Sequence, residues 1–120
     1  VSQEISTPVN LAVKLTDVPK LIDKNSRVLY ADAAKLQFPL KLRKWHSGDW
    51  FFPFGMEGKK KLSDFFTNQK FNLKEKEETW LLLSGEEVVW VVGHRPDNRF
   101  KITETTERVL QIELKRDEMT

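Results

Sequence analysis

The chain has 120 residues, of which 39% are hydrophobic and 32% are charged, and its formal net charge is +2. This size and composition are typical of one folded domain with a modest core rather than of a disordered chain. The absence of cysteine excludes disulfides and thiolate metal sites, and no apolar run reaches the roughly 18 residues that a transmembrane helix needs. The first residue is not methionine and the N-terminus carries no signal-peptide pattern, so we expect a cytoplasmic piece of a longer protein.

The first third of the chain predicts strands separated by turns. Residues 1–8 are polar and end at a proline, so we predict a linker or inter-domain arm there. Apolar residues alternate with polar or small ones over residues 9–15, which predicts a half-buried strand, and the apolar run 28–31 predicts a second one. Residues 36–42 alternate again, but Pro39 has no N–H to donate, which predicts an edge strand or a bulge.

The second half predicts one helix, a buried hairpin and a last strand. Apolar residues at positions i, i+3 and i+4 within residues 60–69 form one face of a short helix, and the charged stretch 74–78 is expected to be exposed. Residues 80–83 and 88–92 flank a glycine-containing turn and are apolar at nearly every position. We therefore predict a β-hairpin that is covered on both faces and central in a sheet. Alternation over residues 110–114 predicts a final strand.

These elements indicate a small layered α+β domain. Its strands are mostly antiparallel and arranged in hairpins, and it has one or two short helices. We place this single domain over residues 9–116 and a frayed tail at residues 117–120.

Glycine, aromatic and basic residues gather between positions 42 and 70. A basic-aromatic triplet at residues 43–45 is followed by the aromatic run 50–52 and by three consecutive lysines at residues 59–61. Glycines lie between these groups, and glycine is used where the backbone needs a positive φ or a close approach. We expect this stretch to form a surface that contacts an anionic partner.

The three lysines fall at the start of the predicted helix. The helix dipole is already positive there, so each cation costs a few tenths of a kcal/mol to about one. One interpretation is an anion site made of lysines and free helix N–H groups. The other is a solvated charge run, which is the ordinary role of a lysine triplet. The sequence alone leaves both interpretations open.

The sequence shows no catalytic or metal-binding motif. His46 and His94 are the only histidines, and neither has the spacing of a metal site. Residues 55–58 lack the length and the Ser or Thr of a Walker A loop, and their match to a GXXG nucleic-acid clamp is weakened by the charge of Glu57. Asp49 is interpreted as organising the neighbouring glycine turn. We predict no catalytic and no metal-binding residue in this chain.

Two longer runs resemble a known family. Residues 39–66, PLKLRKWHSGDWFFPFGMEGKKKLSDFF, and residues 89–100, VWVVGHRPDNRF, resemble the C-terminal domain of bacterial tRNA(Ile)-lysidine synthetase. Many unusual residue types agree at fixed offsets, and the resemblance covers most of residues 36–114. It implies a layered fold that is similar to a domain of the phenylalanyl-tRNA synthetase β subunit.

The resemblance also implies a function. The parent enzyme, a ligase, uses ATP with magnesium and free lysine to convert the wobble cytidine of an isoleucine tRNA with a CAU anticodon to lysidine. That reaction belongs to an N-terminal catalytic domain with an SGGxDS-type pyrophosphate loop, which this chain lacks. We therefore expect no catalysis and no cofactor here. The expected partners are the acceptor-stem region of that tRNA and the N-terminal domain of the same chain, and no membrane.

An acceptor stem is A-form RNA, whose phosphates, 2′-hydroxyls and single-stranded end are open to a protein. Basic side chains on a rigid loop suit this task. An alternative is a structural inter-domain module that packs against the parent enzyme without touching RNA. Under the first hypothesis, the candidate tRNA-binding residues are Arg43, Lys44, Trp45, Lys59, Lys60, Lys61, Arg95 and Arg99.

Overall fold

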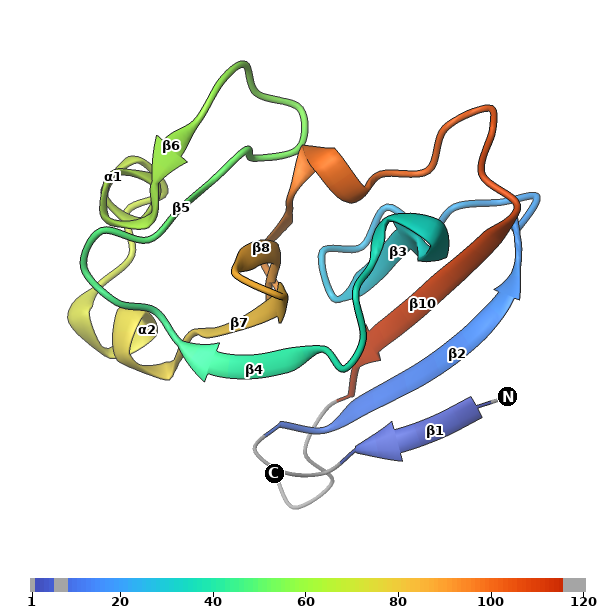
Figure 1. Cartoon of the computed structure of the whole chain (residues 1–120). Helices are drawn as coiled ribbons and strands as arrows, with labels where there is room; N and C mark the ends of the chain where they lie inside the picture. Colours follow the sequence, from blue (N-terminus) through green and yellow to red (C-terminus); the bar gives the residue numbers. More distant parts are fainter. Residues whose placement is uncertain (1, 6–8, 116–120) are drawn as a thin grey trace. The chain divides into compact units, whose positions relative to one another are not determined.

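The computed structural model describes residues 2–5 and 9–115, and their contacts divide the chain into two compact units (Figure 1). The first unit comprises the described residues of 1–36 and 100–120, and the second unit comprises residues 37–99. The second unit is thus a continuous insertion into the sequence of the first. The short 3-10 helix η2 (Asn98–Phe100) crosses the sequence boundary between them.

The first unit is an antiparallel sheet with the strand order β1-β2-β10-β3. Strand β10 is central, and its Ile112 lies opposite Val13 on one side and Leu29 on the other. Buried apolar side chains from β3 and β10 form the core of this unit. Its elements are β1 (Ser2–Ile5), β2 (Leu11–Asp17), β3 (Val28–Asp32), the 3-10 helix η1 (Ala33–Lys35) and β10 (Arg108–Leu114).

The predicted strands of this unit are present with shifted ends, but the N-terminal arm needs correction. Ser2–Ile5 forms strand β1 because its backbone pairs with β2, with Ser2 opposite Lys14. A polar sequence without apolar alternation gave no signal for this pairing. Residues 6–8 and 117–120 lie outside the described residues, and the single domain over residues 9–116 stays a prediction.

The second unit combines a four-stranded sheet of order β4-β7-β8-β9 with a two-stranded ladder and two helices. As predicted, β7 and β8 form a hairpin, are buried along nearly their whole length, and occupy the two central positions of the sheet. The elements are β4 (Lys41–Lys44), β5 (Trp50–Phe51), β6 (Lys60–Lys61), α1 (Leu62–Asn68), α2 (Leu73–Glu78), β7 (Trp80–Ser84), β8 (Glu87–Val91) and β9 (Arg95–Pro96).

The core of the second unit lies between α1, β5 and the β7–β8 hairpin. The predicted apolar face of α1 is confirmed, because Leu62, Phe65 and Phe66 are all buried. Phe51 packs edge-on against Phe65 with ring centroids 5.2 Å apart. Burying each such side chain contributes about 1.5–3 kcal/mol, so this cluster fixes β5 against the sheet.

Two expectations about local structure were wrong. The strand predicted over residues 36–42 begins only at Lys41, because the Gln37 N–H donates to Ser84 Oγ rather than to a ladder and Pro39 has no N–H. The helix begins at Leu62 rather than at Lys60, since Lys60–Lys61 pairs with β5. The predicted class is confirmed: mostly antiparallel strands with two short α-helices. No helix among the described residues is long and apolar enough to cross a membrane.

Candidate nucleic-acid interface

All eight candidate residues lie in the second unit, and several of them meet around Trp50. The Nζ atom of Lys59 lies 4.6 Å from the Trp50 ring centroid, and the guanidinium carbon of Arg99 lies 5.1 Å from it. Lys61 is directly opposite Trp50 in the β5–β6 ladder, so both side chains lie on the same face. Trp50 itself is 39% exposed. We call Trp50, Lys59, Lys61 and Arg99 the Trp50 cluster.

Lys60 occupies the other face of the same ladder. It is opposite Phe51, which is fully buried in the core of the unit. Because successive side chains of a strand point to opposite faces, Lys60 and Lys61 point apart. Lys61 is exposed and Lys60 is half-buried. Among the residues that the structure describes, neither Nζ atom has a hydrogen-bond or ion-pair partner.

Arg99 is held in place by two carboxylates. Its Nε and Nη2 atoms donate to Asp97 at 3.0 Å each, and its Nη1 atom donates to Glu87 at 2.7 Å. The guanidinium also stacks over Phe52, with 4.9 Å between its carbon and the ring centroid. Arg99 therefore adds positive charge to the Trp50 cluster, although most of its N–H groups are hydrogen-bonded within the protein.

Asp97 also fixes the segment that leads to the lysines. It is 1% exposed and accepts a hydrogen bond from the Phe52 backbone N–H at 2.9 Å. The Phe54 N–H donates to the Pro96 carbonyl at 2.9 Å, and Arg95 Nη1 donates to the Phe54 carbonyl at 3.0 Å. The segment before Lys59 is thus bound to β9 by backbone and side-chain contacts, and it presents Phe54 with 47% of its surface exposed.

Arg43 and Asp49, the residue before β5, form a bidentate ion pair. Arg43 Nη1 and Nη2 donate to the two Asp49 oxygens at 2.8 and 3.0 Å. The His46 N–H donates to Asp49 Oδ2 at 2.6 Å, which confirms that Asp49 organises the adjacent turn. Burial opposes ionisation of Asp49, but these hydrogen bonds outweigh it and lower the pKa of the carboxyl. The Asp49 hydrogen bond is also the main cause that raises the pKa of Arg43.

Lys44 and Trp45 make their contacts with the helices and β7 rather than with Trp50. Lys44 Nζ donates to the Glu77 carbonyl at 2.6 Å and lies 4.4 Å from the Trp80 ring centroid. Trp45 packs edge-on against Phe66 with ring centroids 5.0 Å apart, on the rim of the core. Trp45 therefore supports α1.

The start of helix α1 offers fewer free N–H groups than the anion-site interpretation assumes. Helix α1 has only seven residues, and its first N–H, on Leu62, donates to the Asp49 carbonyl at 2.8 Å. Lys61, at the N-cap position, makes no side-chain capping hydrogen bond, so both interpretations of the lysines stay open.

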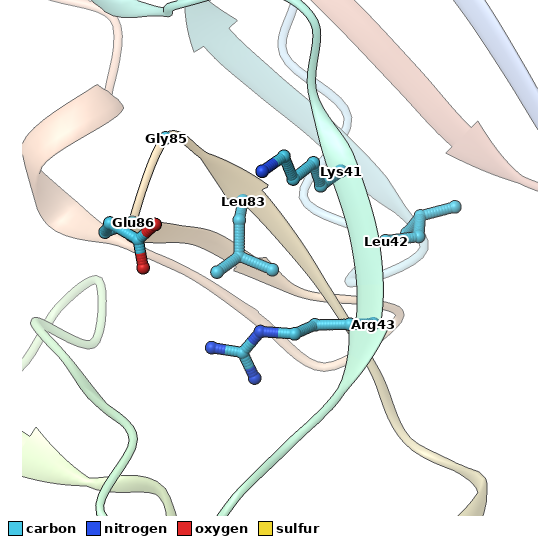
Figure 2. A pocket seen from close by; sticks show the side chains of 6 residues that line it. All are labelled: Lys41, Leu42, Arg43, Leu83, Gly85 and Glu86. Atoms are coloured by element: carbon cyan, nitrogen blue, oxygen red, sulfur yellow. The ribbon is translucent and has the colours of Figure 1, made fainter.

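A pocket of about 380 Å³ opens beside β4 and the β7–β8 turn (Figure 2). Lys41 and Arg43 point to the same side of β4, toward Leu83 and Glu86, while Leu42 points away from them. Sequence analysis did not single out Lys41 or Glu86. Residue 43 lies beyond the strand predicted over residues 36–42, and only the pairing of β4 with β7 brings the turn next to residues 41 and 43. The lining residues are Lys41, Leu42, Arg43, Leu83, Gly85 and Glu86.

Of the two histidines, His94 packs against the rim of the core of the second unit. The His94 ring packs on Phe71 with 4.7 Å between ring centroids, and burial lowers its pKa. Over residues 2–5 and 9–115, no three His, Cys, Asp or Glu side chains come together as potential metal ligands.

Comparison with known proteins identifies the family of this chain. The sequence profile described as "TilS substrate C-terminal domain" matches residues 40–114. The chain belongs to this family. The matched range of the TilS C-terminal domain contains all eight candidate residues, together with the pocket and the Trp50 cluster.

Curated relatives agree with the TilS assignment. The tRNA(Ile)-lysidine synthase of Parabacteroides distasonis is 63% identical over 89 residues, which cover 74% of this chain and 20% of the relative. The corresponding protein of Bacteroides thetaiotaomicron is 53% identical over 79 residues (66% and 18%), and that of Clostridium acetobutylicum is 37% identical over 97 residues (81% and 21%). The chain spans about a fifth of the length of these relatives.

A solved structure shares the fold. The crystal structure of a TilS C-terminal domain superposes with a TM-score of 0.78 at 16% sequence identity, and the match covers 98% of this chain and 92% of the other. The resemblance seen over residues 39–66 and 89–100 is therefore confirmed at the level of family and fold. The RNA-binding roles of the eight residues stay predictions.

Proposed function

We propose that this chain is a non-catalytic, tRNA-binding domain of a tRNA(Ile)-lysidine synthase. In this proposal it holds the acceptor-stem region of the isoleucine tRNA with the CAU anticodon. Membership of the TilS family supports the assignment to this enzyme, and the Trp50 cluster supports a role in binding RNA. The observation that carries the proposal is the exposed pair Lys59 and Lys61 beside a half-exposed tryptophan, on a segment fixed by a buried carboxylate.

The geometry suits an RNA backbone. Phosphate contacts supply most of the affinity of sequence-independent binding, and a backbone that is already fixed loses little entropy when its lysines meet them. Exposed aromatic rings add stacking surface for unpaired bases; Trp50 lies against Lys59, and Phe54 is exposed on the segment that leads to it. Arg43, Lys44, Arg95 and Arg99 already serve protein contacts, so we expect them to add long-range attraction more than direct hydrogen bonds.

The chemistry would belong to the remainder of the parent enzyme. ATP, magnesium and lysine would bind an N-terminal catalytic domain, which is also the protein partner of this chain, in the cytoplasm. Here the side chains that face the solvent around Trp50 are cationic and aromatic rather than metal-ligating. The role left to this domain is to position the tRNA.

The test is a double variant within the lysine triplet. Replacing Lys59→Ala and Lys61→Ala removes the two cations on the Trp50 face, so binding of an acceptor minihelix should weaken and the salt dependence should lose roughly one unit of slope per lost phosphate contact. Lys60→Ala is the matched control from the opposite face and should change both quantities less. A second control, Lys14→Ala with Lys20→Ala, removes the same charge from the first unit.

Affinity is measured by titration at several salt concentrations, and the contact surface by amide shifts of the labelled chain. Shifts confined to residues 37–99 and a selective effect of the double variant would support the proposal. Equal effects of the double variant and the first-unit control would show that only net charge matters. If the chain ignores the minihelix yet binds the catalytic domain, the domain serves as an inter-domain module.

A further inference from the structure

We propose that the pocket beside β4 and the β7–β8 turn binds one unpaired nucleotide of RNA, with a preference for a base that carries an exocyclic amino group. This inference rests on the proposed function of the chain as a tRNA-binding domain. It adds a specific subsite to a surface that otherwise contacts phosphates. The subsite consists of Lys41, Arg43, Leu83, Gly85 and Glu86.

The pocket has the size and the lining that a nucleotide needs. Its volume of about 380 Å³ lies in the range of small-ligand sites, which is roughly 300–1,000 Å³. Leu83 lines the pocket with an apolar side chain that is only 3% exposed, and Gly85 leaves the turn without a side chain at the rim. Gly85 has φ +58°, and an added Cβ would lie 3.1 Å from Gln37 Oε1, so a side chain there would be both strained and crowded.

Cationic groups stand on the β4 side of the pocket. Lys41 Nζ has no hydrogen-bond or ion-pair partner among residues 9–115. Arg43 uses three hydrogen bonds, two to Asp49 and one to the Lys44 carbonyl, and a guanidinium has five N–H groups. Lys41 and the remaining Arg43 donors can therefore hold a phosphate, and Asp49 fixes the position of the guanidinium.

A carboxylate stands on the opposite side. Glu86 lies on the β7–β8 turn, faces the same space as Lys41 and Arg43, and makes no hydrogen bond or close ion pair with a described side chain (Figure 2). After Asp49, its charge is a further cause that raises the pKa of Arg43 across the pocket. A carboxylate accepts a hydrogen bond from the amino group of cytosine or adenine, whereas uracil offers a carbonyl oxygen at that position. A purely phosphate-binding pocket would not place a carboxylate beside its cations, so the mixed lining favours a whole nucleotide.

The pocket is connected with the Trp50 cluster through a short series of contacts. Arg43 on its wall binds Asp49, and the next residue, Trp50, pairs with Lys61. In this proposal, an RNA strand whose phosphates meet Lys59 and Lys61 continues from there to the pocket. Sequence-dependent RNA recognition acts mainly on unpaired nucleotides, whose base edges are accessible. The single-stranded end beside a stem is the segment of a tRNA that fits this description.

The first experiment titrates the labelled chain with CMP, AMP and UMP. We expect shifts of the Leu83 methyl groups and the Gly85 amide with CMP and AMP, and an affinity about tenfold lower for UMP, because one base hydrogen bond is worth about that factor. Glu86→Ala should remove the discrimination against UMP, and Lys41→Ala should weaken all three nucleotides alike. Glu104→Ala and Lys20→Ala, two exposed first-unit positions, are the matched controls.

The second experiment distinguishes an RNA end from a free nucleotide. A minihelix with its unpaired 3′ nucleotides should shift Leu83 and Gly85, and a minihelix trimmed to the base-paired stem should not. Equal pocket shifts with both would overturn the assignment to an RNA end. Absence of pocket shifts with any nucleotide or minihelix, while the minihelix still binds through Lys59 and Lys61, would overturn the subsite and leave the proposed function intact. Nucleotide binding in the pocket without minihelix binding would overturn the proposed function instead.

Discussion

At the residue scale, Asp97 shows how a buried charge can organise a binding surface. Its carboxylate is almost completely excluded from water and is satisfied by the Phe52 N–H and by Arg99. A buried ion costs several kcal/mol unless it is paired and hydrogen-bonded, so the pair is needed once either member is present. The same contacts place Arg99 against Trp50, which couples the stability of the unit to the shape of the candidate interface.

Asp97→Asn should therefore destabilise the protein by about 3 kcal/mol, because it leaves a half-buried guanidinium and a backbone N–H without their charged partner. Urea unfolding measures the change. Asp17→Asn is the matched control, since the Asp17–Arg108 pair has a similar distance of 2.6 Å but lies on the exposed surface, where such pairs contribute about 0–1 kcal/mol. A similar loss of stability from both substitutions would show that the contribution of the Asp97 ion pair does not depend on its burial.

His94 gives the chain a pH dependence with a defined sign. Packing against Phe71 lowers its pKa in the folded state, so the unfolded chain binds the proton more readily. Stability from this group is present above the ordinary histidine pKa of about 6.5 and is lost as the pH falls from there through the lowered pKa of the folded state. His94→Gln should reduce the difference between urea midpoints at about pH 7.5 and pH 5.5. An unaltered difference in His94→Gln would contradict the assignment.

At the element scale, the structure separates what apolar patterns can predict from what they cannot. The β7–β8 hairpin and the apolar face of α1 were predictable because burial determines both patterns. Helix α2 has no buried residue and so has no apolar stripe to detect. The two-residue strands β5 and β6 are too short to show alternation, and Lys60–Lys61 was therefore assigned to the helix that follows it. The pocket depends on strand pairing, which a single sequence does not specify.

Helix α2 depends on its N-terminal cap instead of on burial. Asn72 accepts from the Glu75 N–H at 2.8 Å, and the Glu75 carboxylate accepts from the Asn72 N–H at 3.0 Å. Loss of such a cap costs about 1 kcal/mol. In Asn72→Ala we expect hydrogen exchange of the α2 amides to accelerate by about fivefold to tenfold, with little change elsewhere. Asn68→Ala, at the exposed end of α1, is the control, and unchanged α2 exchange in Asn72→Ala would show that the cap is dispensable.

At the scale of the whole molecule, the location of the basic residues is more informative than the net charge. The net charge is only +2, yet all eight candidate residues lie within residues 37–99. The family was recognisable in the sequence because residue types such as the glycines, tryptophans and lysines recur at fixed offsets in that segment. The individual roles of the basic residues were not recognisable, because the sequence does not show which of them are held by protein groups, as Arg43, Lys44 and Arg99 are.

The order of strands in the first unit has a consequence for synthesis on the ribosome. Strand β10 lies between β2 and β3, and it follows the entire insertion of residues 37–99 in the sequence. A growing chain emerges from its N-terminus, and its parts fold as they are completed. The second unit is therefore complete before β2 and β3 receive the strand that joins them. The second unit, with its candidate RNA surface, can therefore fold while the sheet of the first unit still lacks β10.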